Sequence, residues 1–334
     1  MAVTAASILK NSTNNVFFNF YILSSSDLND DLQKIEIYGY SNFKIINKVI
    51  NEPLDKNICS KLPNHVTLES ALRLYAPKIL TDVEKCIILD VDLIINHDIE
   101  KLYNIDIENF YAGGGLGFYP KITEVNLKFR YDFIKKYKLK DNLYFNTGVL
   151  LLNLNKIRSD GAELLLLDTM HKYGKDNLRL FDQDLINIAY QGMGRGMIKP
   201  IDPRWCVCFN VITRPSEDCY IIHWAGRNKP WNYPFTEHIK LYFDYARLSN
   251  YYAFIKSDLL KIIDNNIDFL HKDIKYKRYK RKLKLIDHRI FGKQLFQKLK
   301  KHYETKLSEY QKQKYEKENF YDYLIDLKNY LNNK

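Results

Sequence analysis

The stretch CIILDVDLI, Cys86–Ile94, ends an apolar run on two carboxylates that a single valine separates. The run is typical of a buried strand, so Asp90 is expected at the carboxyl edge of a sheet, where α/β proteins bind ligands. Alternate residues of an extended chain share a face, which lets Asp90 and Asp92 converge on one cation. The alternative is a solvated strand end, because acid pairs at this spacing also arise by chance.

Apolar runs alternate with helical patterns through the first two-thirds of the chain. This order predicts an α/β domain over residues 1–249, with a mainly parallel central sheet covered by helices on both faces. The predicted strands are 16–23, 43–47, 86–90, 110–114, 147–153 and 219–224, and the predicted helices are 2–12, 25–38, 68–80, 123–137 and 181–191.

The composition changes near residue 250. Of the formal net charge of +11, residues 251–334 carry +10, with 21 basic against 11 acidic side chains. We interpret residues 250–334 as a basic, aromatic helical tail and expect residues 271–305 to bind an anionic membrane surface. A solvated helical extension is the alternative, and nucleic-acid binding is a third reading without a recognisable motif.

Five cysteines (Cys59, Cys86, Cys206, Cys208 and Cys219) occur at irregular spacing without a C-x-x-C pair. This argues against a zinc site or disulfide framework and favours a reducing cytosol. No apolar run has the length of a membrane span, and the start of the chain lacks a signal-peptide pattern.

A second feature is IIHWAGRNKPW, residues 221–231, where a predicted strand delivers His223 to a loop containing Gly226 and Lys229. Histidine accepts Mn²⁺, and lysine is a point charge suited to a diphosphate. Taken singly, His223 would be interpreted as a buried structural histidine and Lys229 as a surface lysine.

Two further groups place polar residues beside apolar runs. Asn146 and Thr147 open the strand of LYFNTGVLLLN (143–153), and Asp182, Gln183 and Asp184 open the helix of FDQD (181–184). Acids in a first helical turn also serve as simple dipole partners.

Taken in order, these motifs resemble glycosyltransferase family 8 over residues 2–235. The family contains bacterial lipopolysaccharide galactosyl- and glucosyltransferases and glycogenin, so the resemblance implies a GT-A fold and hexose transfer from a UDP-sugar with retention. The matching segments are ALRLYAPKIL, CIILDVDLIINHDI, YFNTGVLLLNL, FDQDLINIAY and IIHWAGRNKPW.

The resemblance also implies roles for individual residues. Mn²⁺ (or Mg²⁺) would be the cofactor. Gln183 and Asp184 would be catalytic, with front-face departure and attack favoured over a covalent intermediate. The metal ligands would be Asp90, Asp92 and His223, and the donor would further contact Arg73, Val91, Asn146, Thr147, Asp182, Gly226 and Lys229.

The chain departs from the family pattern in two places. Family members begin with a central strand that ends in aspartate, whereas this sequence starts inside the following helix, which predicts an opened sheet and impaired UDP binding. Leu116 stands where many members carry an acid. A rival D-x-D class, the aspartate-nucleophile phosphatases, would want threonine where Ile94 stands.

The leading hypothesis is therefore a hexosyltransferase that uses UDP-glucose or UDP-galactose and acts on a lipopolysaccharide, lipooligosaccharide or other surface-glycan acceptor. It would work in the cytoplasm, peripherally on the inner face of the cytoplasmic membrane. The alternatives are a truncated, non-catalytic remnant of such an enzyme and a protein that binds nucleic acid through its tail.

Overall fold

The computed structural model describes residues 1–13, 16–51, 68–116, 124–174, 176, 178–208, 216–226, 228–271 and 322–332. The chain divides into two compact units. Unit 1 comprises Met1–Lys229 and Asp244–Tyr251, and unit 2 comprises Pro230–Phe243 and Tyr252–Lys334. The predicted division after residue 249 stays a prediction.

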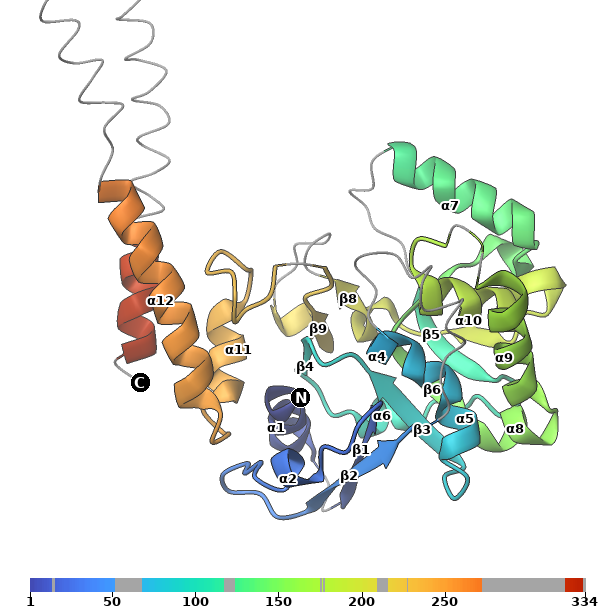
Figure 1. Ribbon diagram of the computed structural model, residues 1–334, viewed down its shortest axis with the longest axis horizontal. Helices are drawn as coiled ribbons and strands as arrows, with labels where there is room; N and C mark the ends of the chain where they lie inside the picture. The colour runs from blue at the N-terminus through green and yellow to red at the C-terminus, as the bar shows by residue number, and fades with distance from the viewer. Residues whose placement is uncertain are drawn as a thin grey trace, which may run out of the picture. The chain divides into compact units, whose positions relative to one another are not determined.

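The described strands of unit 1 form three sheets that share one α/β architecture with the helices around them (Figure 1). Every strand predicted from the sequence is present, which confirms the α/β class. The sheets are β1(Phe18–Ser24)-β2(Phe43–Val49); β3(Lys85–Leu89)-β6(Phe145–Asn153)-β5(Ala112–Leu116)-β7(Ile198–Pro200); and β4(Leu93–Ile95)-β9(Ile221–His223)-β8(Val207–Cys208).

The strand directions differ from the mainly parallel sheet that the sequence predicted. Among the described strands, three pairings are parallel and three are antiparallel, because β6 runs opposite to both β3 and β5 and β4 runs opposite to β9. A continuous apolar run signals burial on both faces but carries no information on direction.

Strands β1 and β2 pair only with each other among the described residues, yet β1 and β3 share one apolar core. Phe18 and Phe20 of β1 pack on the same apolar cluster as Ile87 and Leu89 of β3. Both strands are largely half-buried.

The helices confirm most of the sequence pattern. Residues 68–80 are broken into three short pieces, with Pro77 at the start of the last. The helices are α1 Ala2–Asn11, α2 Asn29–Leu32, α4 Leu68–Ala71, α5 Ala76–Ile79, α6 Glu100–Tyr103, α7 Glu124–Tyr137, α8 Leu154–Ser159, α9 Ala162–Tyr173, α10 Phe181–Gln191, α11 Ile239–Ala246 and α12 Tyr252–His271; the 3₁₀ turns are η1 Leu72–Tyr75, η2 Lys140–Asn142, η3 Gly192–Gly194, η4 Pro203–Trp205 and η5 Ser216–Asp218.

The helix predicted over 25–38 is wrong beyond the single turn α2. Ile37 forms an antiparallel bridge with Ser249, and the Tyr38 N–H donates to the Leu248 carbonyl at 2.7 Å. This long-range pairing supplies backbone hydrogen bonds that the local helical pattern would otherwise have made.

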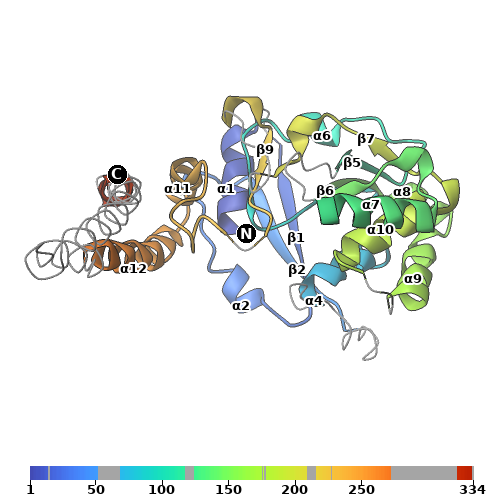
Figure 2. The same ribbon diagram turned by 90° about the horizontal axis from the view of Figure 1, so that it is seen from above.

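Helix α1 is buried along nearly its whole length and supports the loop that carries the D-x-D motif through the Thr4 hydroxyl. In Figure 2 it lies next to β9. The Thr4 hydroxyl donates to the Leu93 carbonyl at 2.9 Å, and the Ile95 N–H donates to the Ser7 hydroxyl at 2.9 Å. A helix that is buried on all sides needs its polar side chains paired, and here they tie α1 to β4.

In unit 2, α12 packs against the helical residues 322–332. Leu259 and Ile263 of α12 and Leu324 and Leu327 of the second segment are fully buried, and Lys328 pairs with Asp264 at 2.6 Å. The basic stretch 272–321 lies outside the described residues, so the predicted membrane surface at 271–305 is not described beyond His271. Among the described helices, none combines the length and apolar character that a bilayer crossing requires.

Candidate active site

The D-x-D acids lie in the crossing between two sheets, rather than within one strand as the sequence suggested. Asp90 follows β3, and its N–H donates to the Gly148 carbonyl of β6 at 2.8 Å. Asp92 precedes β4, and its carbonyl accepts the Trp224 N–H at 3.0 Å. Asp90 thus adds one hydrogen bond to the β3–β6 pairing, and Asp92 adds one to the β4–β9 pairing. These bonds hold the two carboxylates beside β6 and β9.

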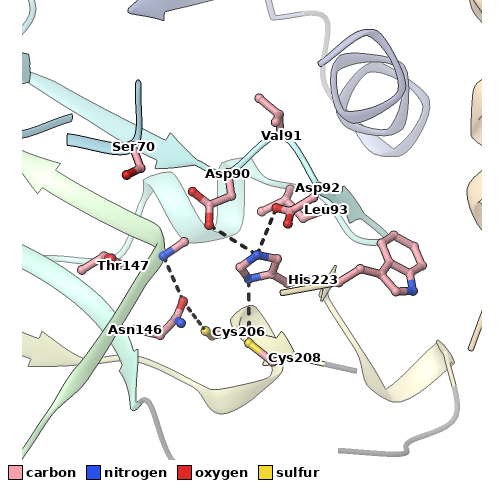
Figure 3. Close-up of polar contacts among 12 residues, drawn as sticks. Ser70, Asp90, Val91, Asp92, Leu93, Asn146, Thr147, Cys206, Cys208 and His223 are labelled. Carbon is pink, nitrogen blue, oxygen red and sulfur yellow. Dashed lines mark hydrogen bonds and ion pairs between the residues drawn. The ribbon is translucent and has the colours of Figure 1, made fainter. Parts of the chain in front are cut away.

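His223 ends β9 and brings the two acids together (Figure 3). Its Nε2 atom lies 3.3 Å from Asp90 Oδ2 and 3.1 Å from Asp92 Oδ1, and its side chain is buried. One ligand atom from each of the three residues lies within 4.8 Å of the others. Two carboxylate oxygens and an imidazole nitrogen are a donor set that suits a divalent cation such as Mn²⁺ or Mg²⁺.

The backbone of β6 makes room for this cluster at Gly148. A Cβ atom at this position would lie 2.5 Å from His223 Cε1 and 2.7 Å from Asp90 Oδ2. No side chain fits there without moving a predicted metal ligand. Glycine is therefore required by close approach rather than by its backbone angles.

Charge around the cluster is balanced by two cations. Burial raises the pKa of Asp90, but the Arg73 charge and the His223 hydrogen bond outweigh it and hold that pKa well below its usual range. The Arg73 guanidinium pairs with Asp90 Oδ1 at 2.5 Å and with Asp182 Oδ2 at 3.0 Å. Lys229 pairs with Asp92 and donates to the Trp224 carbonyl at 2.8 Å.

Two further groups near the cluster have shifted pKa values. Burial lowers the pKa of His223, but its hydrogen bonds to Asp90 and Asp92 outweigh that effect and raise the pKa well above its usual value. Burial raises the pKa of Asp182 to about 6, against the lowering effect of Arg73. Opposed shifts of this kind are common where charged groups are gathered to hold a ligand.

A polar network adjoins the acids along β6 and α10. The Gln183 Oε1 atom accepts from Asn146 Nδ2 at 3.1 Å and from the Thr147 N–H at 3.2 Å. Arg73 donates to the Thr147 carbonyl at 2.5 Å, which links this network to the Asp90 side. Tyr144 bonds both Gln183 and Asp184.

The structure therefore gathers most of the predicted site residues. Val91 points outward with 60% of its surface exposed, and its carbonyl accepts from Thr4 at 3.2 Å. Gly226 adopts a φ of 98°, in the left-handed region that favours glycine. Leu116 ends β5.

Four residues near the site escaped the sequence analysis: Tyr144, Gly148, Cys206 and Cys208. Cys208 pairs with His223 in the parallel β8–β9 register, and its Sγ lies 3.8 Å from His223 Nδ1. Cys206 Sγ lies 3.4 Å from Asn146 Oδ1 (Figure 3). The C-x-C spacing of Cys206 and Cys208 was visible in the sequence. Only the strand pairing shows that Cys208 faces His223.

The comparison with known families defines the protein as a glycosyltransferase. Residues 1–234 match the profile of Glycosyl transferase family 8, and the chain belongs to this family. A Haemophilus influenzae protein named "Putative glycosyltransferase" is 27% identical over 243 residues, which cover 70% of this chain and 69% of that protein.

Solved structures share the fold at low sequence identity. An active-site mutant of LgtC superposes with a TM-score of 0.58 at 18% identity, covering 75% of this chain and 91% of that chain. The galactosyltransferase LgtC, in complex with donor and acceptor sugar analogues, gives 0.56 at 18% identity, covering 73% and 89%. GlyE of Streptococcus pneumoniae TIGR4 gives 0.53 at 17% identity, covering 73% and 56%.

Proposed function

We propose that this glycosyltransferase moves glucose or galactose from a UDP-sugar to a surface-glycan acceptor of the lipopolysaccharide or lipooligosaccharide type, with retention at the anomeric carbon. The observation that carries the proposal is the convergence of Asp90, Asp92 and His223 beside the Lys229 ammonium. This arrangement suits a divalent cation that holds a diphosphate. LgtC, the structural neighbour solved with donor and acceptor sugar analogues, supports a two-sugar reaction at this site.

In the proposed reaction, Asp90, Asp92 and His223 hold the cation and Lys229 contacts the diphosphate through its ammonium group. When bound, Mn²⁺ would supply positive charge that stabilises the diphosphate of the leaving group. Arg73 keeps Asp90 ionised and oriented, while Asn146, Thr147 and Asp182 line the donor sugar. Gln183 lies beside the reacting carbon, where departure and attack occur on the same face.

We place the reaction in the cytoplasm, on the inner face of the cytoplasmic membrane, where a lipid-linked acceptor resides. The support is the charge of the sequence, since nearly all of the net +11 belongs to residues 251–334. Binding of the full chain to anionic vesicles, but not to neutral ones, would support this location. Equal binding to both would contradict it.

The central test is UDP titration of the full chain with and without Mn²⁺. We expect saturable UDP binding that tightens at least ~10-fold with Mn²⁺, because the cation neutralises carboxylate and diphosphate charges that otherwise repel. Release of UDP from UDP-glucose or UDP-galactose should depend on Mn²⁺ in the same way. Absence of both Mn²⁺-dependent binding and release would contradict the proposal and favour a remnant.

The Cys208→Ala variant should weaken Mn²⁺ binding by about 10-fold. Cys208 Sγ faces Nδ1 of His223, whereas Nε2 faces the acids. An Nδ1–H donor aimed at sulfur leaves the Nε2 lone pair directed at the metal, and outer contacts of this kind contribute about 10- to 100-fold in affinity. Calorimetric Mn²⁺ titration in the presence of UDP measures the change.

Cys86→Ala is the matched control. Cys86 lies on β3, and its free thiol packs against the large apolar core cluster instead of against His223. Equal Mn²⁺ affinities of the two alanine variants would show that the Cys208 sulfur does not orient the histidine.

A further inference from the structure

We infer that Tyr144 and Asp184 are positioning residues that fix the side-chain amide of Gln183, the residue we place beside the reacting carbon. The inference rests on the proposed function and refines it. It replaces the direct catalytic role that the sequence suggested for Asp184.

The orientation of the Gln183 amide follows from its fixed neighbours. The Thr147 backbone N–H can only donate, so the atom 3.2 Å from it must be the Gln183 oxygen. Asn146 is oriented in the same way, since its Oδ1 accepts the Gly148 N–H at 2.9 Å and its Nδ2 is therefore turned toward Gln183. Two donors thus hold the Gln183 oxygen.

Tyr144 holds the other end of the amide. Its hydroxyl accepts from Gln183 Nε2 at 2.9 Å and donates to Asp184 Oδ1 at 2.6 Å. A hydroxyl has one hydrogen, and a carboxylate can only accept, so Asp184 draws that hydrogen and leaves a lone pair for Gln183. Burial raises the pKa of Tyr144 well above its usual value, which keeps the hydroxyl protonated.

Asp184 is itself held at both carboxylate oxygens. Its second oxygen accepts the Leu180 N–H at 2.9 Å, and the residue is only 1% exposed. Gln183 is 7% exposed, and one of its two amide hydrogens has no acceptor among the residues that the structure describes. Gln183 is therefore the member of this network with a group left to contact a donor sugar, and Asp184 and Tyr144 determine where that group points.

The test compares Tyr144→Phe and Gln183→Ala, alone and combined, by UDP release with excess Mn²⁺. Tyr144→Phe should lower kcat by about 10- to 100-fold, the range expected for a misdirected group at a reacting centre. The donor KM and UDP affinity should stay within about 3-fold. The double variant should be no slower than Gln183→Ala, because Tyr144 acts only through Gln183.

Tyr190→Phe is the matched control. Tyr190 lies on α10, the helix that carries Gln183 and Asp184, and is at least as buried as Tyr144. Its hydroxyl has no hydrogen-bond partner among the described residues. We expect unchanged kcat for this variant. A loss equal to that of Tyr144→Phe would overturn the inference, since removal of any buried hydroxyl from this region would then explain both.

Asp184→Asn provides a second variant if Tyr144→Phe does not fold. The new side chain keeps only one of the two acceptor oxygens of Asp184, so it cannot hold both the Tyr144 hydroxyl and the Leu180 N–H as acceptor; kcat should fall about 10-fold and again add nothing to Gln183→Ala. The positioning role would be overturned if the kcat losses of Asp184→Asn and Gln183→Ala were additive in the double variant. It would also be overturned if Asp184→Asn lowered kcat by more than about 1,000-fold while Tyr144→Phe stayed near wild type. No UDP release by the wild-type chain would overturn the proposed function as well.

Discussion

Replacement of Asp92 by asparagine is expected to lower the turnover of the UDP-sugar by about 1,000-fold or more. The Asp92 carboxylate lies between His223 and Lys229, with one oxygen 3.1 Å from His223 Nε2 and the other bonded to the Lys229 ammonium. Asparagine keeps the size of the side chain but removes the charge that a divalent cation requires. Electrostatic groups that act on developing charge contribute about 10²- to 10³-fold each, and here the cation and Lys229 are both affected.

The measurement is Mn²⁺-dependent UDP release, together with Mn²⁺ affinity determined in the presence of UDP. Asp106→Asn is the matched control, because Asp106 accepts a turn N–H from Glu108 at 2.9 Å in an exposed loop outside the site. We expect this control to retain full turnover. Wild-type turnover by Asp92→Asn would show that the Asp90, Asp92 and His223 cluster is not the metal site.

The second large effect is expected from Gly148→Ala, which removes no functional group. The added Cβ would lie 2.5 Å from His223 Cε1 and 2.7 Å from Asp90 Oδ2, closer than carbon atoms approach in folded proteins. Displacing either neighbour costs free energy, because His223 is buried and Asp90 is paired with Arg73. We expect turnover to fall at least ~100-fold, since a shift of about 1 Å at a reactive site has that effect.

Gly114→Ala is the matched control in the neighbouring strand. Its Cβ would lie 3.1 Å from Leu150 Cδ2 and 3.3 Å from Ile198 Cγ2, so it crowds apolar side chains instead of metal ligands. Both variants should unfold at a lower temperature than wild type, but only Gly148→Ala should lose Mn²⁺ affinity. If the two folded variants bind Mn²⁺ equally well, the close approach of Gly148 to His223 and Asp90 is not needed for the metal site.

The predicted metal ligands were accessible from sequence because each follows or ends an apolar run. Asp90 follows a five-residue strand, and His223 ends a three-residue strand that is fully buried. Side chains at strand ends collect at one edge of the sheets, and residue chemistry then restricts what they can hold. The polar openings of β6 and α10 were recognised by the same reasoning, through Asn146 and Gln183.

The supporting groups could not be predicted in this way. Cys208 meets His223 through strand register, and Tyr144 forms a hydrogen bond with Gln183 across 39 positions of sequence. A lone tyrosine or cysteine carries no periodic signal, and its partner is known only once the strands are paired. The division of the D-x-D motif between two sheets escaped prediction because β4 is only three residues long and continues directly from the motif.

By itself, the sequence determined the α/β class and the identity of the charged groups, because these follow from hydrophobic periodicity and from side-chain chemistry, and the order of its motifs already resembled the family. The tertiary structure alone decided the strand directions, the close approach at Gly148 and the hydrogen-bond partners of His223 and Gln183. The physical reason is that hydrogen bonds and packing contacts act over a few ångströms in space. Residues distant in the chain meet at that range only after the sheets have formed.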